Sequence, residues 1–419
     1  MMSMTATRLF LIAAFWGFQV ANATPEQELT ANGVIQRVDA ERGVVEVFAG
    51  GQNRTLKIAP DAQFLDAAGK ELPDGARSGE LKAGVEVVLR VDRSGAAPVL
   101  KSLRLGRGAA GAPPPPPVGK VDTSGLVPLT DLGPGEYRGF RGGLYPDGKN
   151  ERPPAHEARG LVLAGELRAL DPQGRPDPSG KIVLLTVGMS NTSQESTAFA
   201  ELANADPQKS PLVCIVNGAQ GGMTAARIQN PEDGGSGAKY WGTVDERLKS
   251  AGATRTQVQA VWLKEADAGP DQGFPKYAQT LRDELVHVVQ VLAARFPRLK
   301  LCYLSSRTYG GYATTKLNPE PYAYESGLSV KWLIEQQLRG DLPLNCDPGR
   351  GPVQAPWLSW GPYLWANGPA PRADGLKFEE QDFGKDGTHP SDAGQKKVGE
   401  LLLQFFKRDS TTRDWFLKK

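Results

Sequence analysis

The first part of the chain alternates apolar and polar residues in short runs. Glycine, aspartate and proline separate these runs, and alternation with a period of two is typical of antiparallel strands. The five runs lie at residues 33–38, 44–48, 54–58, 85–91 and 99–103. The pattern predicts a small all-β barrel of the OB or SH3-like kind at residues 27–107. No residues typical of catalysis are grouped in it, so a spacer or a binding module is expected.

From residue 180 onward, continuous apolar runs alternate with segments of helical periodicity. The apolar runs are aliphatic and β-branched, like strands that are buried on both faces, and they lie at residues 182–187, 212–216, 258–263 and 299–304. The segments with helical spacing lie at residues 194–203, 277–296, 328–338 and 398–405. This order predicts a parallel sheet between two layers of helices, over residues 180–419. Ligands of such sheets bind at the carboxyl ends of the strands.

A proline-rich segment separates the two regions. Residues 113–117 are five consecutive prolines, which favour an extended polyproline conformation. We therefore predict a linker at residues 108–119. The segment 120–179 is rich in glycine and proline, and we predict that it is an ordered lead-in that packs on the second domain and contains a short helix near residues 156–167.

The amino terminus has the pattern of an export signal. Arg8 precedes an almost wholly apolar run at residues 9–20, and Ala21-Asn22-Ala23 is a small-x-small cleavage pattern. The run is too short to span a bilayer comfortably. The sequence predicts a signal peptide at residues 1–23 and a secreted or periplasmic protein without stable membrane insertion after cleavage. An uncleaved anchor is the alternative.

The composition limits the classes of binding partner that can be expected. The chain has 419 residues, of which 23% are charged, and a formal net charge of +2, so nothing indicates nucleic acid or anionic lipid as a partner. The three cysteines form no CxxC or His/Cys pattern with metal spacing, and no metal or cofactor is expected. Cys214 and Cys302 are expected as buried thiols, with a Cys302–Cys346 disulfide as an alternative. The oligomeric state stays open.

Ser190 is the candidate nucleophile. It follows the first apolar run of the second region, and residues 192–195 fit a capping box that opens a helix. A serine beside a helix amino terminus is accessible and close to N–H groups that favour negative charge. A serine that only caps the turn is the alternative.

The fragment Asp386-Gly387-Thr388-His389 supplies the candidate base. Asp386 is close enough in sequence for its carboxylate to accept the imidazole Nδ1–H of His389 within one turn. That bond fixes the tautomer and stabilises the imidazolium that forms when Nε2 takes a serine proton. The chain has two other histidines: we expect His287 on a helix surface and His156 in a structural role.

These fragments resemble the sequence blocks of the SGNH (GDSL-type) hydrolases over residues 180–407. Gly188-Met189-Ser190 resembles the first block, whose serine is the nucleophile, and Asp386 and His389 resemble the fifth. Residues 217–222 resemble the second block, with Gly222 at the place of a glycine that donates its N–H to the oxyanion. The resemblance implies a flavodoxin-like three-layer α/β/α hydrolase fold. It also implies an oxyanion hole that includes the N–H groups of Ser190 and Gly222.

The third block departs from the family pattern. The family has an asparagine there as a third oxyanion donor, but Ala266 stands at this place. Carbohydrate esterases of the superfamily have a Trp-x-Gln-Gly-Glu string, which residues 262–265 resemble in shortened form. This implies Lys264 as a substitute donor, unless it pairs with Glu265 or Asp267. The substrate-binding candidates from the second and third blocks are Asn217, Trp262 and Glu265.

The resemblance and the export signal together imply an exported serine esterase. The expected substrate is an ester, in particular an O-acetyl group on a carbohydrate. A loop before the Asp-His fragment contains four aromatic residues, Trp357, Trp360, Tyr363 and Trp365. These side chains either stack on a sugar or pack the loop. Arg307 and Tyr309 follow the fourth apolar run and are candidates to line the cleft. The alternatives are a lipid or other acyl esterase and a non-catalytic glycan or cell-wall binding protein that kept the fold.

Overall fold

The computed structural model describes residues 28–49, 52–82, 85–92, 98–105 and 122–418. The predicted signal peptide and the predicted linker lie outside the described residues. The chain divides into two compact units, Met1–Gly111 and Ala112–Lys419, and each unit is described by itself.

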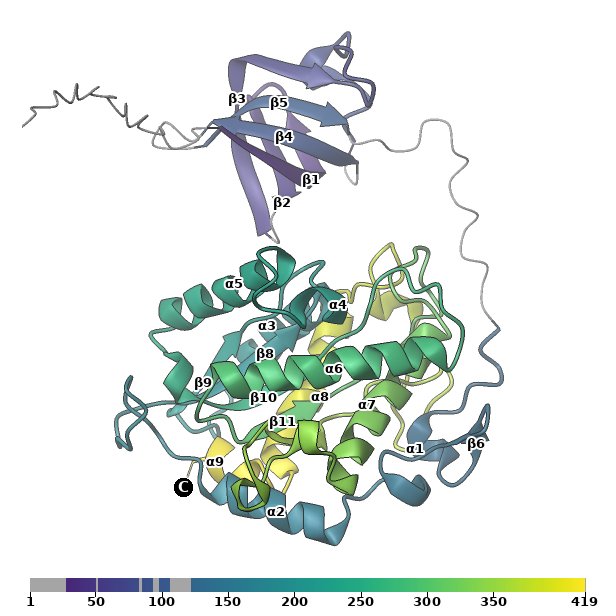
Figure 1. Ribbon diagram of the computed structural model, residues 1–419. Coiled ribbons are helices and arrows are strands. Elements are labelled where there is room, and N and C mark those ends of the chain that lie inside the picture. The colour runs from purple at the N-terminus through teal and green to yellow at the C-terminus, as the bar shows by residue number, and fades with distance from the viewer. Residues whose placement is uncertain (1–27, 50–51, 83–84, 93–97, 106–121, 419) are drawn as a thin grey trace, which may run out of the picture. The chain divides into compact units, whose positions relative to one another are not determined.

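The amino-terminal unit contains a closed five-stranded barrel (Figure 1). Its elements are β1 (Glu28–Asp39), β2 (Val44–Ala49), β3 (Gln52–Leu65), η1 (Gly75–Arg77), β4 (Glu86–Asp92) and β5 (Val99–Leu105). The strands pair in the order β1-β2-β3-β5-β4, and β1 closes the barrel on β4. Only β3 and β5 run parallel. The predicted all-β barrel of the OB kind is therefore confirmed.

The alternation of apolar and polar residues along the strands explains which side chains form the core of the barrel. Leu89 lies opposite Leu103 and Val87 opposite Leu105 on the paired strands β4 and β5, and all four side chains are buried. Every second residue points inward because successive side chains of a strand point to opposite faces. Burying apolar surface in this way is the main favourable term in folding.

The second unit is built on a five-stranded parallel sheet. Its strands are β8 (Ile182–Gly188), β9 (Val213–Asn217), β10 (Val258–Lys264), β11 (Leu301–Leu304) and β12 (Trp357–Trp360), and they lie in the order β12-β11-β10-β8-β9. This is the flavodoxin-like order, with its switch point between β8 and β10. The predicted parallel α/β fold is confirmed.

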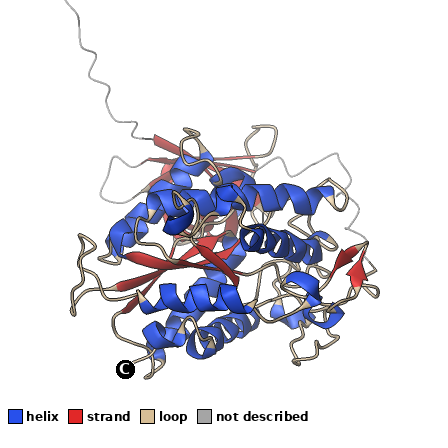
Figure 2. Cartoon of the chain, turned by 60° about the horizontal axis from the view of Figure 1, so that its bottom comes forward, coloured by secondary structure: helices blue, strands red, loops and turns tan. Residues whose placement is uncertain are grey.

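Helices cover both faces of this sheet (Figures 1 and 2). One layer contains α3, α8, α9 and α2, which contact one another in pairs, and the other contains α4, α5, α6 and α7. The helices are α1 (Leu129–Leu132), α2 (Pro154–Gly165), α3 (Ser190–Ala205), α4 (Ala225–Ile228), α5 (Ser236–Ser250), α6 (Lys276–Arg295), α7 (Tyr322–Arg339), α8 (Asp392–Arg408) and α9 (Arg413–Phe416). The smaller elements are β6 (Glu136–Tyr137), β7 (Phe140–Arg141), η2 (Pro146–Gly148), η3 (Arg255–Gln257), η4 (Leu342–Leu344), η5 (Pro348–Arg350) and η6 (Glu380–Asp382).

The aromatic loop before the Asp-His fragment contains a strand that the sequence pattern did not predict. Residues Trp357–Trp360 form β12, which pairs with β11. Trp357, Trp360 and Trp365 are buried, and the indole N–H of Trp360 donates to the carbonyl oxygen of Leu144 in the lead-in. The aromatic residues therefore pack the fold. A strand of four residues, with the sequence Trp-Leu-Ser-Trp, is too short to show a periodicity that can be recognised from sequence.

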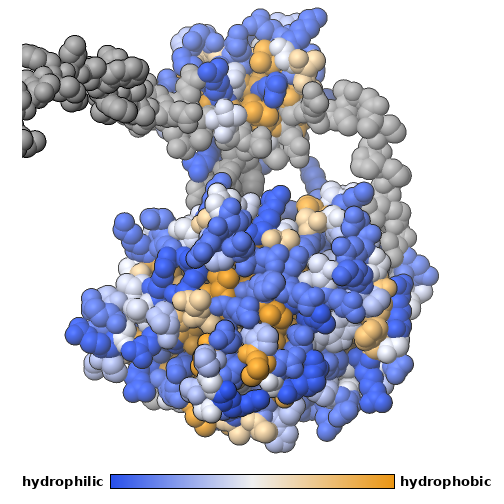
Figure 3. Space-filling model, viewed as in Figure 1, coloured by the Kyte–Doolittle hydropathy of each residue, from blue (hydrophilic) through white to orange (hydrophobic). Residues whose placement is uncertain are grey.

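The surface seen in Figure 3 is mostly hydrophilic, and its apolar residues lie in small separate groups. None of the helices in the described part of the chain has the length and hydropathy that a bilayer crossing requires. Cys214, Cys302 and Cys346 are all free, so the alternative of a Cys302–Cys346 disulfide is wrong.

Candidate active site

A tight turn from β8 into α3 presents Ser190. Gly188 ends the strand with φ of +157°, and a Cβ at this position would lie 2.2 Å from the carbonyl oxygen of Lys264. Only glycine fits there, because any side chain would collide with the neighbouring strand. Ser190 is the first residue of α3, after Met189 as the N-cap. Its hydroxyl therefore lies at the carboxyl edge of the sheet.

The capping box predicted at residues 192–195 is wrong. The helix begins at Ser190 with Met189 as its N-cap, and this N-cap makes no side-chain hydrogen bond. Thr192 instead donates its hydroxyl to the carbonyl oxygen of Lys264 at 2.7 Å, and Glu195 lies deeper in the helix, where it pairs with the Lys264 ammonium. Both side chains connect α3 to β10.

The structure brings Ser190, His389 and Asp386 together. The Ser190 Oγ lies 2.8 Å from His389 Nε2, and His389 Nδ1 lies 2.5 Å from Asp386 Oδ2. The histidine and aspartate side chains are 33% and 28% exposed, so solvent-borne molecules reach them. A hydroxyl, an imidazole and a carboxylate in this order form the hydrogen-bonded chain that activates a serine.

The Asp386 carboxylate is held in its ionised form. Its Oδ1 accepts the backbone N–H groups of Thr388 and His389, each at 3.0 Å. Burial works to raise the pKa of Asp386, but the hydrogen bonds from the His389 ring and from these two N–H groups outweigh it and lower the pKa to about 2. A carboxylate that stays charged at neutral pH can orient the ring and stabilise its cationic form.

Two contacts fix the loop that bears Asp386 and His389. Gly387 has φ of +63°, and a Cβ there would lie 1.8 Å from the carbonyl oxygen of Tyr312. Asn191, which follows the nucleophile, donates its side-chain amide to the carbonyl oxygen of Thr388 at 2.7 Å, and this bond is buried. Asn191 therefore connects α3 to the loop that bears His389. Sequence reasoning missed it, because the partner lies 197 residues away.

We expect Asn191→Ala to lower kcat about tenfold while KM stays unchanged, because the imidazole loses its fixed distance from the hydroxyl. The lost buried hydrogen bond also costs about 1–3 kcal/mol of stability. Asn367→Ala is the matched control, since the Asn367 amide also donates to carbonyl oxygens, those of Thr123 and Leu126. Steady-state kinetics and thermal unfolding should show a similar loss of stability in both variants and a loss of kcat only in Asn191→Ala. Equal kcat values would contradict the positioning role.

The loop after β9 lies next to the turn that bears Ser190. The Ser190 N–H is at the first turn of α3, where helix N–H groups have no acceptor within the helix. The loop after β9 is pinned next to it, because the Gln220 N–H donates to the carbonyl oxygen of Gly188. A Cβ on Gly221 would lie 3.8 Å from the Ser190 Cβ. Gly222 follows with φ of +72°, and its carbonyl oxygen accepts from the Arg227 guanidinium at 2.7 Å.

The expectation that Lys264 donates to the oxyanion is wrong. Its ammonium lies 2.6 Å from both carboxylate oxygens of Glu195, and both side chains are fully buried. Burial lowers the pKa of Lys264 to about 8, although Glu195 works against this shift. Glu265 and Asp267, the two alternative partners, do not pair with it either. An enclosed ammonium with a bidentate partner cannot reach a substrate at the sheet edge.

Lys264→Met should destabilise the protein by about 3–5 kcal/mol, because it leaves the Glu195 charge buried without a partner. The double variant Lys264→Met/Glu195→Leu should recover most of this loss, since two apolar side chains often replace a buried ion pair at little cost. Denaturant unfolding measures both effects. A single variant as stable as the wild type would show that Glu195 finds another partner or a proton.

Two of the three substrate-binding candidates, Trp262 and Glu265, are buried, so the prediction is wrong for them, whereas Asn217 is half-buried and its binding role stays a prediction. Asn217 donates its amide to the carbonyl oxygen of Ser193 and braces β9 against α3. Trp262 is fully buried, and its indole N–H donates to Ser305. Glu265 is buried as well, and its Oε2 accepts the N–H of Ala266. The hydrogen bonds of these three side chains stabilise the carboxyl edge of the sheet.

The other two histidines lie away from Ser190. The His156 ring stacks on Trp357 and contacts the carbonyl oxygen of Leu358, which is the structural role expected for it. His287 is exposed on α6 and contacts Gln229, as expected. Among the described residues, no group of three or more His, Cys, Asp and Glu side chains is arranged to hold a metal ion.

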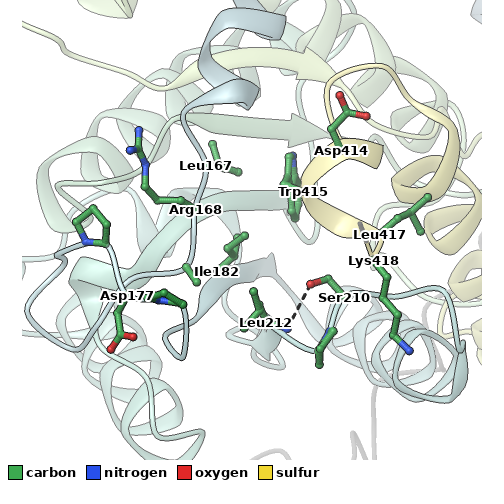
Figure 4. Close-up of a pocket in the computed structure, with 14 residues that line it drawn as sticks. Leu167, Arg168, Asp177, Ile182, Ser210, Leu212, Asp414, Trp415, Leu417 and Lys418 are labelled. Carbon is green, nitrogen blue, oxygen red and sulfur yellow. Dashed lines mark hydrogen bonds between the residues drawn. The ribbon is translucent and has the colours of Figure 1, made fainter.

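A separate cavity of about 650 Å³ lies at the opposite edge of the sheet (Figure 4). Ile182, the first residue of β8, contributes to its wall, as do Leu212, Trp415 and Leu417. Ser190 follows the other end of the same strand, and none of the residues that line the cavity belongs to the Ser-His-Asp group. The cavity is therefore not the candidate active site.

The fold and these contacts define the second unit as a flavodoxin-like α/β domain with a Ser-His-Asp chain at the carboxyl edge of its sheet. No family model matches the chain, and no curated protein matches it. Solved structures give weak matches. A lipase from a goat rumen metagenome is 12% identical with a TM-score of 0.31, and the match covers 54% of this chain and 97% of the lipase.

Two further matches divide between the units. The periplasmic domain of a lipopolysaccharide acetyltransferase from Salmonella ser. Paratyphi A is 13% identical with a TM-score of 0.31, and the match covers 60% of this chain and 95% of that domain. CusF from Escherichia coli is 16% identical with a TM-score of 0.16, and the match covers 21% of this chain and 98% of CusF.

Proposed function

We propose that the second unit is a serine esterase of the SGNH type. The hydrogen-bonded chain from Ser190 through His389 to Asp386 carries this proposal. The three groups come from two segments almost two hundred residues apart, and they meet at the edge of the sheet where ligands bind in this fold. Their order and distances match the requirements of nucleophilic catalysis without a metal.

In the proposed reaction, the Ser190 Oγ attacks the carbonyl carbon of an ester and its proton passes to His389 Nε2. Asp386 stabilises the imidazolium through Nδ1. The tetrahedral oxyanion lies against the N–H groups of Ser190 and Gly222. It collapses when Nε2 returns the proton to the leaving alcohol oxygen, and an acyl-enzyme remains. Water then attacks the acyl carbon with the same base, and the acid and the free serine are released.

The oxyanion hole has two backbone donors in this proposal. Ala266 offers no side-chain donor at the third position, and Lys264 is engaged with Glu195. Loss of one oxyanion donor typically lowers kcat by about 10²–10³-fold. We therefore expect a slower enzyme than a three-donor relative, and an activity that depends on favourable binding of its own substrate.

We propose a short acyl group on a carbohydrate as the substrate, with O-acetyl as the first candidate. The predicted export signal gives access to extracellular glycans. The view in Figure 3 shows no broad apolar patch, of the kind that often marks a binding surface for lipid. A lipid ester is the alternative within the same mechanism. We also propose the secreted or periplasmic location from the signal pattern.

The barrel is proposed as a spacer or binding module. Residues 28–105 contain no histidine, cysteine, methionine or tryptophan. Soft metals such as Cu(I) are bound by thiolate, thioether or imidazole groups, so this donor set does not fit such a metal. The barrel therefore receives no metal-binding role in this proposal.

Hydrolysis of a graded set of esters tests the proposal. Purified protein is incubated with 4-nitrophenyl acetate, butyrate and octanoate and with O-acetylated oligosaccharides, and released acid is measured. We expect fastest turnover of acetate and labelling of the protein by a fluorophosphonate probe. If the wild type releases no acid from any ester and the probe does not react, the esterase proposal fails. The altered third block then favours a glycan-binding protein that kept the fold, which a glycan array tests directly.

A further inference from the structure

Arg307 is a buried cation whose guanidinium has no partner. It follows β11, and the residue is 4% exposed. Its backbone N–H donates to the hydroxyl of Ser326, but the guanidinium makes no hydrogen bond or ion pair with any residue in the described part of the chain. The Nε atom is enclosed and unsatisfied. A buried charge is costly unless it is paired and hydrogen-bonded, so this guanidinium would gain from binding an anionic group.

The carboxylates around Arg307 are not available to it. Glu195 is engaged by both of its oxygens with Lys264. Glu320 accepts N–H groups from Gly310, Tyr324 and the Trp365 indole. Burial raises the pKa of Glu265 well above its usual range, and its Oε2 accepts the N–H of Ala266. The Arg307 charge therefore lacks a protein counter-ion at contact distance.

Lys264 and Arg307 differ in whether the charged group has a partner, and this difference favours a structural role for Lys264 and a binding role for Arg307. Both are buried cations at the ends of neighbouring strands. Lys264 has a bidentate partner and a fully enclosed side chain. The Arg307 guanidinium has no hydrogen-bond or ion-pair partner among the described residues, and the residue is 4% exposed. A guanidinium binds a planar carboxylate through two parallel N–H···O bonds.

The sheet register places Arg307 on the same edge as the nucleophile. Val187 of β8 is aligned with Leu263 of β10, and Leu263 with Leu304 of β11. Ser190 and Arg307 each lie three residues beyond this row. Two strand spacings separate β8 from β11, which is about 10 Å. An ester at Ser190 and a carboxylate at Arg307 thus fit one substrate of the size of one or two sugar rings.

We propose that Arg307 forms a subsite for a carboxylate of the substrate, so that the enzyme hydrolyses acyl esters on acidic sugars. This inference rests on the proposed esterase function and narrows its substrate class. Binding the carboxylate compensates the buried cation and fixes the sugar relative to the Ser190 hydroxyl. Charge-assisted hydrogen bonds of this kind contribute enough to set a substrate preference.

A matched pair of substrates tests the subsite on the wild-type protein. The pair is an O-acetylated galacturonic acid disaccharide and the same disaccharide with its carboxylates methyl-esterified. We expect kcat/KM for acetate release to be about 10–100-fold higher for the acid, as charged hydrogen bonds predict. Equal values for the two substrates, or a preference for the methyl ester, overturn the proposal.

Substitutions of Arg307 distinguish a role in substrate recognition from a role in packing. Arg307→Gln and Arg307→Lys should lower kcat/KM for the acid about 10–100-fold and leave turnover of 4-nitrophenyl acetate within about twofold, since a neutral ester does not use the subsite. Equal losses on both substrates indicate a structural role and overturn the proposal. Arg413→Gln is the control, because Arg413 is exposed and forms its ion pair with the adjacent residue, Asp414.

A binding measurement distinguishes failure of the subsite from failure of the esterase proposal. Calorimetric titration of the Ser190→Ala variant with the unacetylated galacturonic acid disaccharide requires no chemistry. Binding that is lost with the methyl-esterified disaccharide and in Ser190→Ala/Arg307→Gln supports the subsite, whether or not hydrolysis occurs. Absence of binding overturns the subsite even if the wild type hydrolyses 4-nitrophenyl acetate.

Discussion

Ser190→Ala should lower ester hydrolysis by about 10⁵-fold or more, to the rate of the uncatalysed background. The Ser190 Oγ is the atom that forms the bond to the acyl carbon in the proposed mechanism, and it is hydrogen-bonded to His389 Nε2. The fold should persist, because within the described part of the chain the hydroxyl bonds only to the His389 ring. The variant should also lose its reaction with a fluorophosphonate probe.

Ser250→Ala is the matched control for this loss. Ser250 is an exposed serine at the end of α5, and its hydroxyl donates to the carbonyl oxygen of Glu246. We expect this variant to keep wild-type rates with 4-nitrophenyl acetate and full labelling by the probe. Hydrolysis that continues at the wild-type rate in Ser190→Ala would remove the nucleophile from the mechanism and place any activity elsewhere on the chain.

Asp386→Asn should lower kcat by about 10⁴-fold, although the side chain keeps its size. The asparagine amide cannot act as an acceptor toward His389 Nδ1 when its NH₂ group faces the ring. The imidazole then adopts the tautomer whose Nε2 carries a proton and cannot take another from Ser190. The neutral amide also fails to stabilise the imidazolium. Asp392→Asn, an exposed acid just beyond the same loop, should retain wild-type kcat.

The same substitution should change stability in acid. Because the pKa of Asp386 is lowered to about 2 in the fold, from 3.8, its ionisation stabilises the native protein above pH 4. This contribution, of about 2 kcal/mol, is lost as the pH falls from about 4 to 2. Thermal unfolding of Asp386→Asn should therefore show a smaller loss of stability over this pH range than the wild type. Parallel curves would contradict the hydrogen bonds assigned to the carboxylate.

The fold could be predicted because burial leaves a local pattern in the sequence. Alternating residues in β4 and β5 indicated a half-buried barrel strand, and the apolar run that became β8 indicated a strand buried on both faces. The strand β12 was missed, because its four residues are Trp357–Trp360 and lie in a segment dominated by glycine and proline. Its place beside β11 depends on pairing with a distant segment.

The contacts of the site also fall into two groups: those that local spacing predicts and those that depend on distant segments. Asp386 and His389 lie within one turn, so their contact is a local property that spacing reveals. The role expected for Lys264 came from its position in a motif, and it was wrong because its partner Glu195 lies on a helix 69 residues away. The Asn191 hydrogen bond escaped notice for the same reason. Position along the chain does not specify which buried charges meet.

By itself, the sequence determined the two types of fold, the order of the elements and the three groups that a serine mechanism requires. These features follow from hydrophobic periodicity and from short spacings, which act within a few residues. Only the tertiary structure decided that the Ser190 Oγ lies 2.8 Å from His389 Nε2. It also decided that the buried Lys264 ammonium pairs with Glu195, whereas the Arg307 guanidinium has no ion-pair partner among the described residues. Those outcomes depend on which side chains of distant segments share a low-dielectric interior, where each buried charge must find a partner or lack one.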